Sequence, residues 1–316
     1  MSQEPKKNNF LSLLLRVGLS AGLLWFIFSK IDLQKTLEVV KSAVIKYLIF
    51  AFAAFVGINF LILWRWTTFI RAVDLKTPRM TVARFYFAGL FGNLFLPSSI
   101  GGDIIKIAGL CKNNDQKAKV VASVVLDRMS GFAGVVIVGT VAFFFGNKLI
   151  NNNSLVIPII LLAVFSSFVA VFLFNEKVYS AVISIFNSFP KIKAACMQMH
   201  YDMAIMKKRP MEGYKAILIS CLCQLTLAYT FYLTVIALHQ EVKLAYFFIF
   251  VPLICVVTTL PSIGGLGVRE FGAKTLFAMA GVASEVSVSM SLINFLFMVI
   301  VGLLGGLFFF STRTKK

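Results

Sequence analysis

Seven stretches of this sequence contain no Asp, Glu, Lys or Arg, and they constrain the fold more than any other feature. A charge at the centre of a membrane-spanning helix costs several kcal/mol, and about 20 apolar residues cross the hydrocarbon core of a bilayer. Long stretches without charge therefore predict membrane-embedded segments. They cover residues 47–64, 85–102, 129–147, 149–175, 216–238, 244–268 and 286–312.

The composition supports a membrane protein. Of the 316 residues, 59% are hydrophobic and only 14% are charged, whereas a soluble domain keeps about a quarter of its residues charged. Lys and Arg number 31 against 13 Asp and Glu, for a net charge of +18. These cations lie between apolar stretches, as the positive-inside rule and attraction to anionic lipid headgroups would place them. We therefore expect lipid and not nucleic acid as the partner.

Five of the seven stretches predict ordinary spanning helices. Residues 11–28 predict one more span and not a signal peptide, because Ser29-Lys30-Ile31-Asp32 follows them in place of a small-residue cleavage site. The stretches 85–102 and 244–268 end in Pro and several Gly, which a straight helix disfavours. We therefore predict an all-α polytopic membrane protein with about six spanning helices and two re-entrant helical hairpins.

The two Gly/Pro stretches contain an internal repeat. A cation follows the second glycine at the same offset in both copies, Lys106 after Gly102 and Arg269 after Gly265. We expect a true structural duplication. The two copies read Leu96-Pro97-Ser98-Ser99-Ile100-Gly101-Gly102 and Leu260-Pro261-Ser262-Ile263-Gly264-Gly265.

The distribution of Lys and Arg predicts the orientation. With both termini in the cytoplasm of a cell-membrane protein, the expected cytoplasmic segments, which include 65–84, hold 21 Lys and Arg against 8 outside. Residues 30–46 are a basic exception and could form an amphipathic helix on the membrane surface. The hairpins would then enter from opposite sides. This relates two inverted halves, about 10–150 and 213–311, joined by a cytoplasmic linker at 176–212 within one membrane domain, 1–316.

Charged residues beside the apolar stretches are the candidate site, since ionisable groups in a membrane usually face a cavity or each other. Arg and the N-termini of broken helices attract anions, so we predict an anionic substrate. Acids nearby would pair with the cations or take up a proton. The alternative is that these charges only anchor helix ends at the interface. The predicted substrate-binding residues are Lys106, Arg128, Arg269, Gly101, Gly102, Gly264, Gly265 and Asn93, and the predicted charge-pairing residues are Asp103, Asp127 and Glu270.

Several chemistries lack a sequence signal. No Gly-x-x-x-x-Gly-Lys-Ser/Thr motif is present, no Ser/His/Asp or Cys/His arrangement is evident, and the five Cys are scattered. We therefore expect no catalytic residues of these kinds, no metal and no cofactor, although an enzymatic role stays open.

A set of short motifs occurs in a fixed order along the chain: Asn93, Leu96-Pro97, Gly101-Gly102-Asp103, Lys106, Ala122-Ser123-Val124, Asp127-Arg128, Pro261, Gly264-Gly265, Gly267 and Arg269-Glu270. Together these motifs resemble the flippase-like transmembrane family, which is the membrane region of lysylphosphatidylglycerol synthases (the multiple peptide resistance factor). The likeness runs from about residue 10 to 311. Asp103 and Asp127 stand where that family often has Glu, and Lys106 stands where Arg is common.

The resemblance implies a lipid flippase that moves an anionic or aminoacylated phospholipid, or a lipid-linked intermediate, between leaflets. Two alternatives remain. One is an intramembrane enzyme of phospholipid or polyprenyl-phosphate metabolism with Asp103 or Glu270 as general base. The other is an accessory subunit that positions a separate lipid-modifying enzyme. Membrane lipids are the expected partners in each case, and the sequence does not indicate an oligomeric state.

Overall fold

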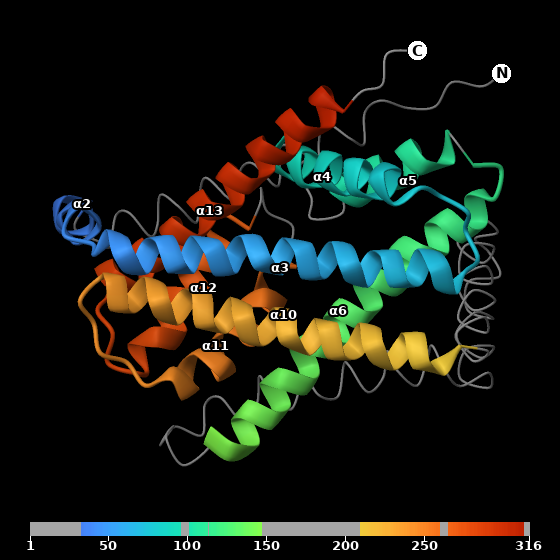
Figure 1. Cartoon of the computed structure of the whole chain (residues 1–316). Coiled ribbons are helices and arrows are strands. Elements are labelled where there is room, and N and C mark those ends of the chain that lie inside the picture. The colour runs from blue at the N-terminus through green and yellow to red at the C-terminus, as the bar shows by residue number, and fades with distance from the viewer. Residues whose placement is uncertain (1–32, 96–100, 113, 147–208, 260–264, 313–316) are drawn as a thin grey trace, which may run out of the picture.

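A computed structural model describes residues 33–95, 101–112, 114–146, 209–259 and 265–312, and its regular elements there are all helices (Figure 1). The predicted spans at 11–28 and 149–175, the tips of both predicted hairpins and nearly all of the linker lie outside the described residues. The helices are α2 (Leu33–Lys41), α3 (Ile45–Ala72), α4 (Arg79–Phe95), α5 (Gly101–Cys111), α6 (Lys117–Gly146), α10 (Pro210–Ala237), α11 (Leu244–Val257), α12 (Val268–Ala278) and α13 (Ser284–Ser311).

Four of the described helices, α3, α6, α10 and α13, are long and apolar enough to cross a membrane. Each contains 28 or 30 residues, or about 42–45 Å at 1.5 Å per residue. They coincide with four of the five stretches predicted as ordinary spans, and the fifth is the one that lies outside the described residues. The predicted all-helical membrane fold is therefore confirmed, while the total number of spans stays a prediction.

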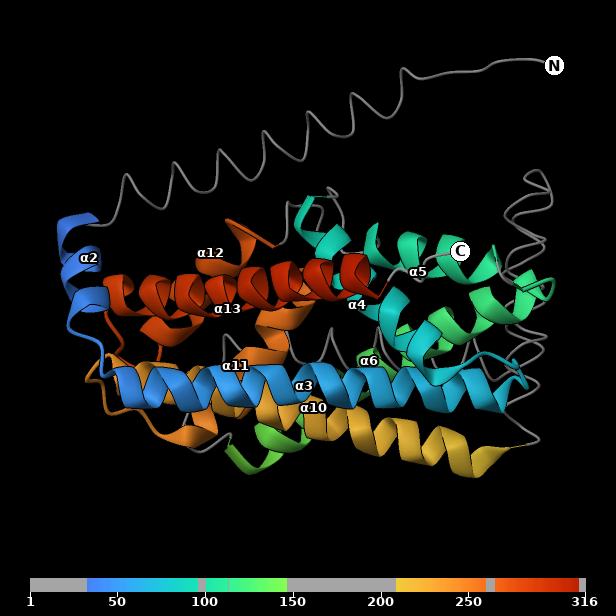
Figure 2. The same ribbon diagram turned by 45° about the horizontal axis from the view of Figure 1, so that its top comes forward.

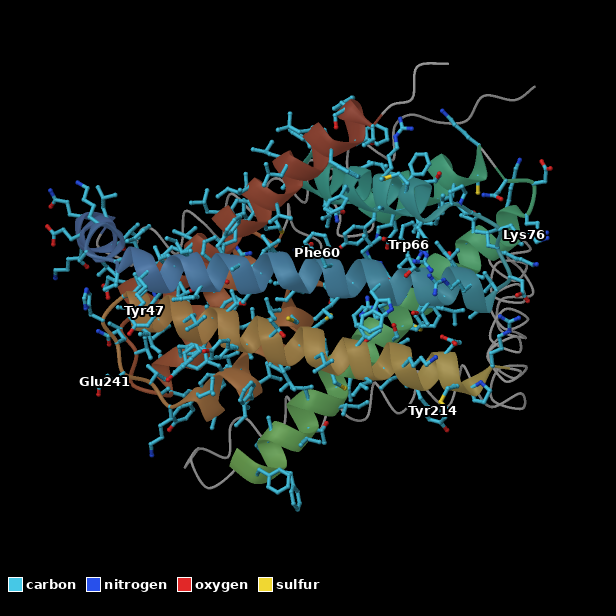
Figure 3. All side chains as sticks on the ribbon, in the orientation of Figure 1. Tyr47, Phe60, Trp66, Lys76, Tyr214 and Glu241 are labelled. Carbon is cyan, nitrogen blue, oxygen red and sulfur yellow. The ribbon has the colours of Figure 1, made fainter. Side chains whose placement is uncertain are left out.

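Helices α3 and α10 lie side by side in opposite directions and define two ends of the bundle (Figure 1). At one end, the Val44 amide donates to the Ala237 carbonyl over 2.8 Å. At the other, Arg209 Nη1 donates to the Arg71 carbonyl over 3.1 Å. In Figure 3, Tyr47 and Glu241 mark the first end, and Lys76 and Tyr214 lie toward the second. We call these the Ala237 end and the Arg71 end.

Four of the five shorter helices, α4 with α5 and α11 with α12, form two pairs that enter the bundle from opposite ends (Figure 2). Asn114 Nδ2 donates to Thr77 Oγ1 over 3.1 Å, so the loop before α4 and the loop after α5 meet at the Arg71 end. The pair α11 and α12 begins and finishes at the Ala237 end, because short loops connect it to the end of α10 and the start of α13. Both pairs therefore point toward the middle of the molecule.

Each short pair packs against a long helix from the opposite half of the chain. Helix α4 lies on α13, where a Cβ added at Gly305 would be 2.9 Å from the Phe87 carbonyl oxygen. Helix α11 lies on α6, where a Cβ added at Gly146 would be 2.6 Å from Ile249. Glycines on the long helices thus allow the short pairs to approach closely.

The two copies of the sequence repeat fold differently at their glycines. Gly101 and Gly102 form the first turn of α5, whereas Gly265 (φ +80°) and Gly267 (φ +83°) precede α12 in a conformation that favours glycine. Because α12 begins only at Val268, Arg269 lies in its first turn while Lys106 lies in the second turn of α5. The equal spacing in sequence therefore does not give equal positions on the helices.

Candidate functional site

Asp103, in the first turn of α5, holds two cations. Its carboxylate accepts from Lys106 Nζ over 3.2 Å and also contacts Arg128 Nε on α6. The side chains of Asp103 and Lys106 are 11% and 9% exposed, while that of Arg128 is 33% exposed. One buried carboxylate thus serves two cations, and Arg128 is the more accessible of them.

Two aromatic rings border the Lys106 ammonium group. Nζ lies 5.2 Å from the ring centroid of Trp66 and 5.1 Å from that of Tyr86, close enough for cation–π attraction. Both rings are buried and hydrogen-bonded in turn: Trp66 Nε1 donates to Ser123 over 3.3 Å and the Tyr86 hydroxyl donates to Asn59 over 3.2 Å. Trp66 on α3 and Tyr86 on α4 therefore hold Lys106 in addition to Asp103.

Asp127 pairs with a residue that the sequence analysis missed. Arg65 Nε lies 2.7 Å from Asp127 Oδ1, and Arg65 Nη1 donates to Ser220 Oγ on α10 over 2.9 Å. Counting Arg65 among the exposed cytoplasmic cations was wrong, since its side chain is only 8% exposed. Arg65 is the first charge after the apolar stretch 47–64, but α3 does not end there and continues to Ala72. The apolar residues Trp66, Phe69 and Ile70 that follow were the available signal.

A second cluster lies at the start of α12. Arg269 Nη2 contacts Glu270 Oε1 over 2.7 Å, and Ser291 Oγ on α13 lies 2.9 Å from both Arg269 Nε and Glu270 Oε1. The other carboxylate oxygen of Glu270 accepts from the Gly267 amide over 2.7 Å, which caps the helix. Phe295 lies beneath the guanidinium, 5.2 Å from Arg269 Cζ. Arg269 is therefore held by α12 and α13.

The predicted glycines and Asn93 have structural contacts of their own. The Gly102 amide donates to Asn93 Oδ1 over 2.7 Å, which ties the end of α4 to the start of α5. Gly101 and Gly102 are buried. A Cβ at Gly102 would be 2.4 Å from the Gly89 carbonyl oxygen, so the two helix backbones are in direct contact. Gly264 lies outside the described residues.

The structure thus groups the predicted residues into two sites. In the first site, Lys106 and Arg128 both contact Asp103. Asp127, the residue before Arg128, pairs with Arg65 on α3. In the second site, Arg269 and Glu270 pair with each other. Among the described residues, no group of three or more His, Cys, Asp or Glu side chains could hold a metal ion. The binding of an anion at Lys106 and Arg128 stays a prediction.

Comparison with known proteins identifies the family. The chain is 27% identical over 202 residues to the UPF0104 membrane protein PH1989 of Pyrococcus horikoshii, an alignment that covers 61% of this chain and 58% of the relative. Residues 13–306 match the family described as the lysylphosphatidylglycerol synthase TM region. Since this match covers nearly the whole chain, the protein is an integral membrane protein that belongs to the lysylphosphatidylglycerol synthase transmembrane-region family.

Proposed function

We propose that this protein moves an anionic or aminoacylated phospholipid, or a lipid-linked intermediate, between membrane leaflets. The observation that carries the proposal is the sharing of one buried carboxylate, Asp103, by Lys106 and Arg128. A phosphate can replace a carboxylate on an Arg fork, because the two anions accept the same pair of N–H bonds.

Arg128 would meet the headgroup first. Its side chain is 33% exposed, against 9% for Lys106, so an entering phosphate reaches the guanidinium before the ammonium group. As the phosphate binds Arg128, Asp103 keeps its contact with Lys106, and no cation is left without a counter-charge. When the lipid leaves, Asp103 takes Arg128 back. Asp103 therefore neutralises Arg128 whenever no lipid phosphate is bound.

The arrangement of the short helices supports transport. With 17, 11, 14 and 11 residues, α4, α5, α11 and α12 are shorter than the roughly 20 residues that cross a hydrocarbon core. Both pairs would therefore be re-entrant hairpins that turn back within the bilayer. The order long, short, short, long occurs twice with reversed direction, which favours inverted repeats around a central path.

The Arg269 cluster would be the second station on this path. Like Lys106, Arg269 is held by an acid next to a broken-helix glycine, and its side chain is 10% exposed. A headgroup would then pass from a cluster on the first hairpin to one on the second, while the acyl chains remain in lipid. This order predicts that both Arg128 and Arg269 are required for exchange.

Lipid exchange in reconstituted vesicles tests the proposal. Acyl-labelled phosphatidylglycerol, lysylphosphatidylglycerol and phosphatidylcholine would be added to vesicles containing the purified protein, with an impermeant quencher to report the outer leaflet. Arg128→Ala and Arg269→Ala are each expected to slow exchange of an anionic or aminoacylated lipid at least tenfold. Lys117→Ala, an exposed cation on the same helix as Arg128, is the matched control and should exchange lipid normally.

Unchanged exchange of all three lipids in both variants, with intact folding, would rule out the proposed path. Formation of a chemically modified lipid from a soluble donor by the purified protein would instead indicate the intramembrane enzyme.

A further inference from the structure

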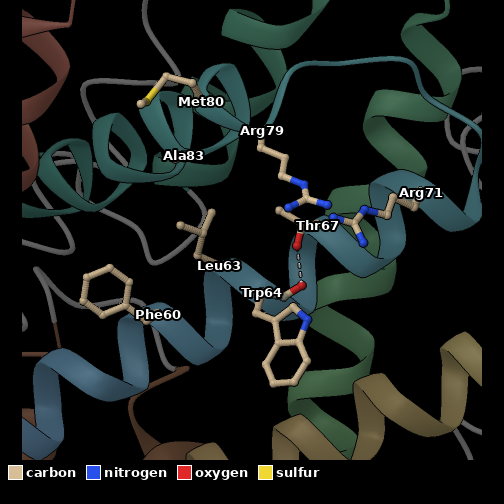
Figure 4. A pocket seen from close by; sticks show the side chains of 8 residues that line it. All are labelled: Phe60, Leu63, Trp64, Thr67, Arg71, Arg79, Met80 and Ala83. Carbon is tan, nitrogen blue, oxygen red and sulfur yellow. Dashed lines mark hydrogen bonds between the residues drawn. The ribbon is translucent and has the colours of Figure 1, made fainter.

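A groove lies between α3 and the start of α4, and none of its lining residues belongs to the ion clusters (Figure 4). It has a volume of about 510 Å³. Its floor comes from α3 and one wall from the first turns of α4. The residues that define its character are Phe60, Leu63, Trp64, Arg71, Arg79 and Met80.

The groove combines two chemistries in a fixed order. Arg71 and Arg79 lie at the Arg71 end, both exposed, and their guanidinium groups lie near each other in Figure 4. Within the described residues no acidic side chain pairs with either one. Toward the middle of the bundle follow Trp64, 58% exposed, and Phe60, 58% exposed. The groove is therefore cationic at one end and apolar along the rest.

The groove and the buried ion pairs use different faces of α3. Phe60, Leu63, Trp64 and Arg71 recur at spacings of three, four and seven, so they share one helix face. Arg65, which pairs with Asp127, and Trp66, which contacts Lys106 in the Asp103 cluster, are buried on a different face of α3. Phe60 and Arg71 are eleven residues apart, or about 16 Å along the axis, which is about the depth of one leaflet of a 30 Å hydrocarbon core.

We propose that this groove binds one anionic phospholipid from the leaflet at the Arg71 end. Its phosphate contacts Arg71 and Arg79, which attract anionic headgroups through charge and bidentate geometry. One acyl chain lies along Trp64 and Phe60 and reaches Met80 on α4. Charge complementarity alone would admit a free phosphate, but a free phosphate leaves this exposed apolar stripe uncovered, whereas a lipid covers both parts.

This site is distinct from the proposed transport path and does not depend on it. The groove and the Lys106 cluster lie on different faces of α3, and no groove residue contacts Asp103, Lys106 or Arg269 through an ion pair within the described part of the chain. A lipid held here could be present whether or not the protein exchanges lipid between leaflets. Binding and exchange can therefore be measured separately.

Native mass spectrometry of the purified full chain tests the site. The protein would be titrated with phosphatidylglycerol and with phosphatidylcholine of the same acyl chains. Wild-type protein is expected to retain one phosphatidylglycerol with at least tenfold preference, since two cations attract the anionic headgroup and phosphatidylcholine carries no net charge. The variant Arg71→Gln/Arg79→Gln should lose that preference, and Arg71→Lys/Arg79→Lys should keep part of it.

Matched controls distinguish specific binding in the groove from non-specific attraction to a basic protein. They also distinguish binding of a lipid from binding of a free anion. Lys76→Gln/Lys112→Gln removes two exposed cations at the same end that do not line the groove and should leave the preference unchanged. Phe60→Ala/Trp64→Ala should weaken retention of both lipids. Equal loss in the Lys76/Lys112 control, an unchanged preference in the Arg71→Gln/Arg79→Gln variant, or displacement of the lipid by millimolar inorganic phosphate would each overturn the proposal.

Discussion

Arg65 and Asp127 form a buried ion pair that stabilises the fold only when both partners are present. Their side chains are 8% and 7% exposed, so removing one leaves an unpaired charge in an apolar interior, at a cost of about 3–5 kcal/mol. We expect Arg65→Ala and Asp127→Ala each to lower the free energy of unfolding by about that amount. Reversible denaturation in detergent micelles measures it.

An exposed ion pair in the same protein is the control for this expected fall in the free energy of unfolding. Arg209 and Asp74 are 2.7 Å apart, but their side chains are 45% and 65% exposed. Because solvent screens such a pair, Arg209→Ala should cost less than about 1 kcal/mol. The double variant Arg65→Ala/Asp127→Ala should lose less stability than the two single losses added together. An additive result would contradict direct coupling of the two charges.

Asp103 is expected to compete with the headgroup for Arg128. Asp103→Asn keeps the size of the side chain but removes this competing charge, so an anionic lipid should bind more tightly and leave more slowly. In the Arg71→Gln/Arg79→Gln background, which removes the groove cations, we expect Asp103→Asn to retain roughly tenfold more phosphatidylglycerol, equivalent to about 1.4 kcal/mol, together with slower exchange. Native mass spectrometry and the vesicle assay measure the two quantities. Asp115→Asn, on an exposed loop residue, is the control, and faster exchange in Asp103→Asn would contradict competition.

At the scale of helices, the contact between α4 and α5 has almost no free space. A Cβ at Gly102 would be 2.4 Å from the Gly89 carbonyl oxygen and 2.7 Å from Asn93 Oδ1, so Gly102→Ala must push the helices apart. Overpacking of this kind costs about 1–3 kcal/mol, and the bond from the Gly102 amide to Asn93 is weakened as well. We expect a clear fall in the thermal unfolding temperature and a loss of lipid exchange.

Gly57→Ala on α3 is the matched comparison for Gly102→Ala. Nothing lies within 4 Å of the added Cβ at that position, so the exchange should leave stability unchanged or raise it by up to about 1 kcal/mol, the helix-propensity difference. If Gly57→Ala were as damaging as Gly102→Ala, the effect would belong to glycine replacement in general and not to the packing of the short pair.

Helices could be predicted from this sequence more completely than the contacts between them. The uncharged stretches predicted α3, α6, α10 and α13, because a spanning helix is one continuous apolar segment of the sequence. The partner of Asp127 could not be found in this way, since Arg65 lies 62 residues away and Ser220 lies 155 residues from Arg65. Similarly, the Gly265 and Gly267 turn shifted Arg269 to an earlier helical position than Lys106, which residue spacing alone does not reveal.

For the whole molecule, the opposed direction of the two short helix pairs makes its orientation in the membrane testable. The Lys and Arg distribution predicts that the Arg71 end is cytoplasmic. In a background without the five native cysteines, Lys76→Cys and Glu241→Cys place one thiol at an exposed position near each end. An impermeant maleimide added to intact cells should label Glu241→Cys but not Lys76→Cys, and permeabilised cells should label both.

The labelling result also decides which leaflet supplies the lipid in the α3–α4 groove. A cytoplasmic Lys76 places Arg71 and Arg79 beside the inner leaflet, whose anionic lipids attract basic residues near the surface. The reverse pattern would place the groove in the outer leaflet. Labelling of both positions from outside would contradict a bundle whose two ends lie on opposite sides of the membrane, and with it the inverted arrangement of the two helix pairs.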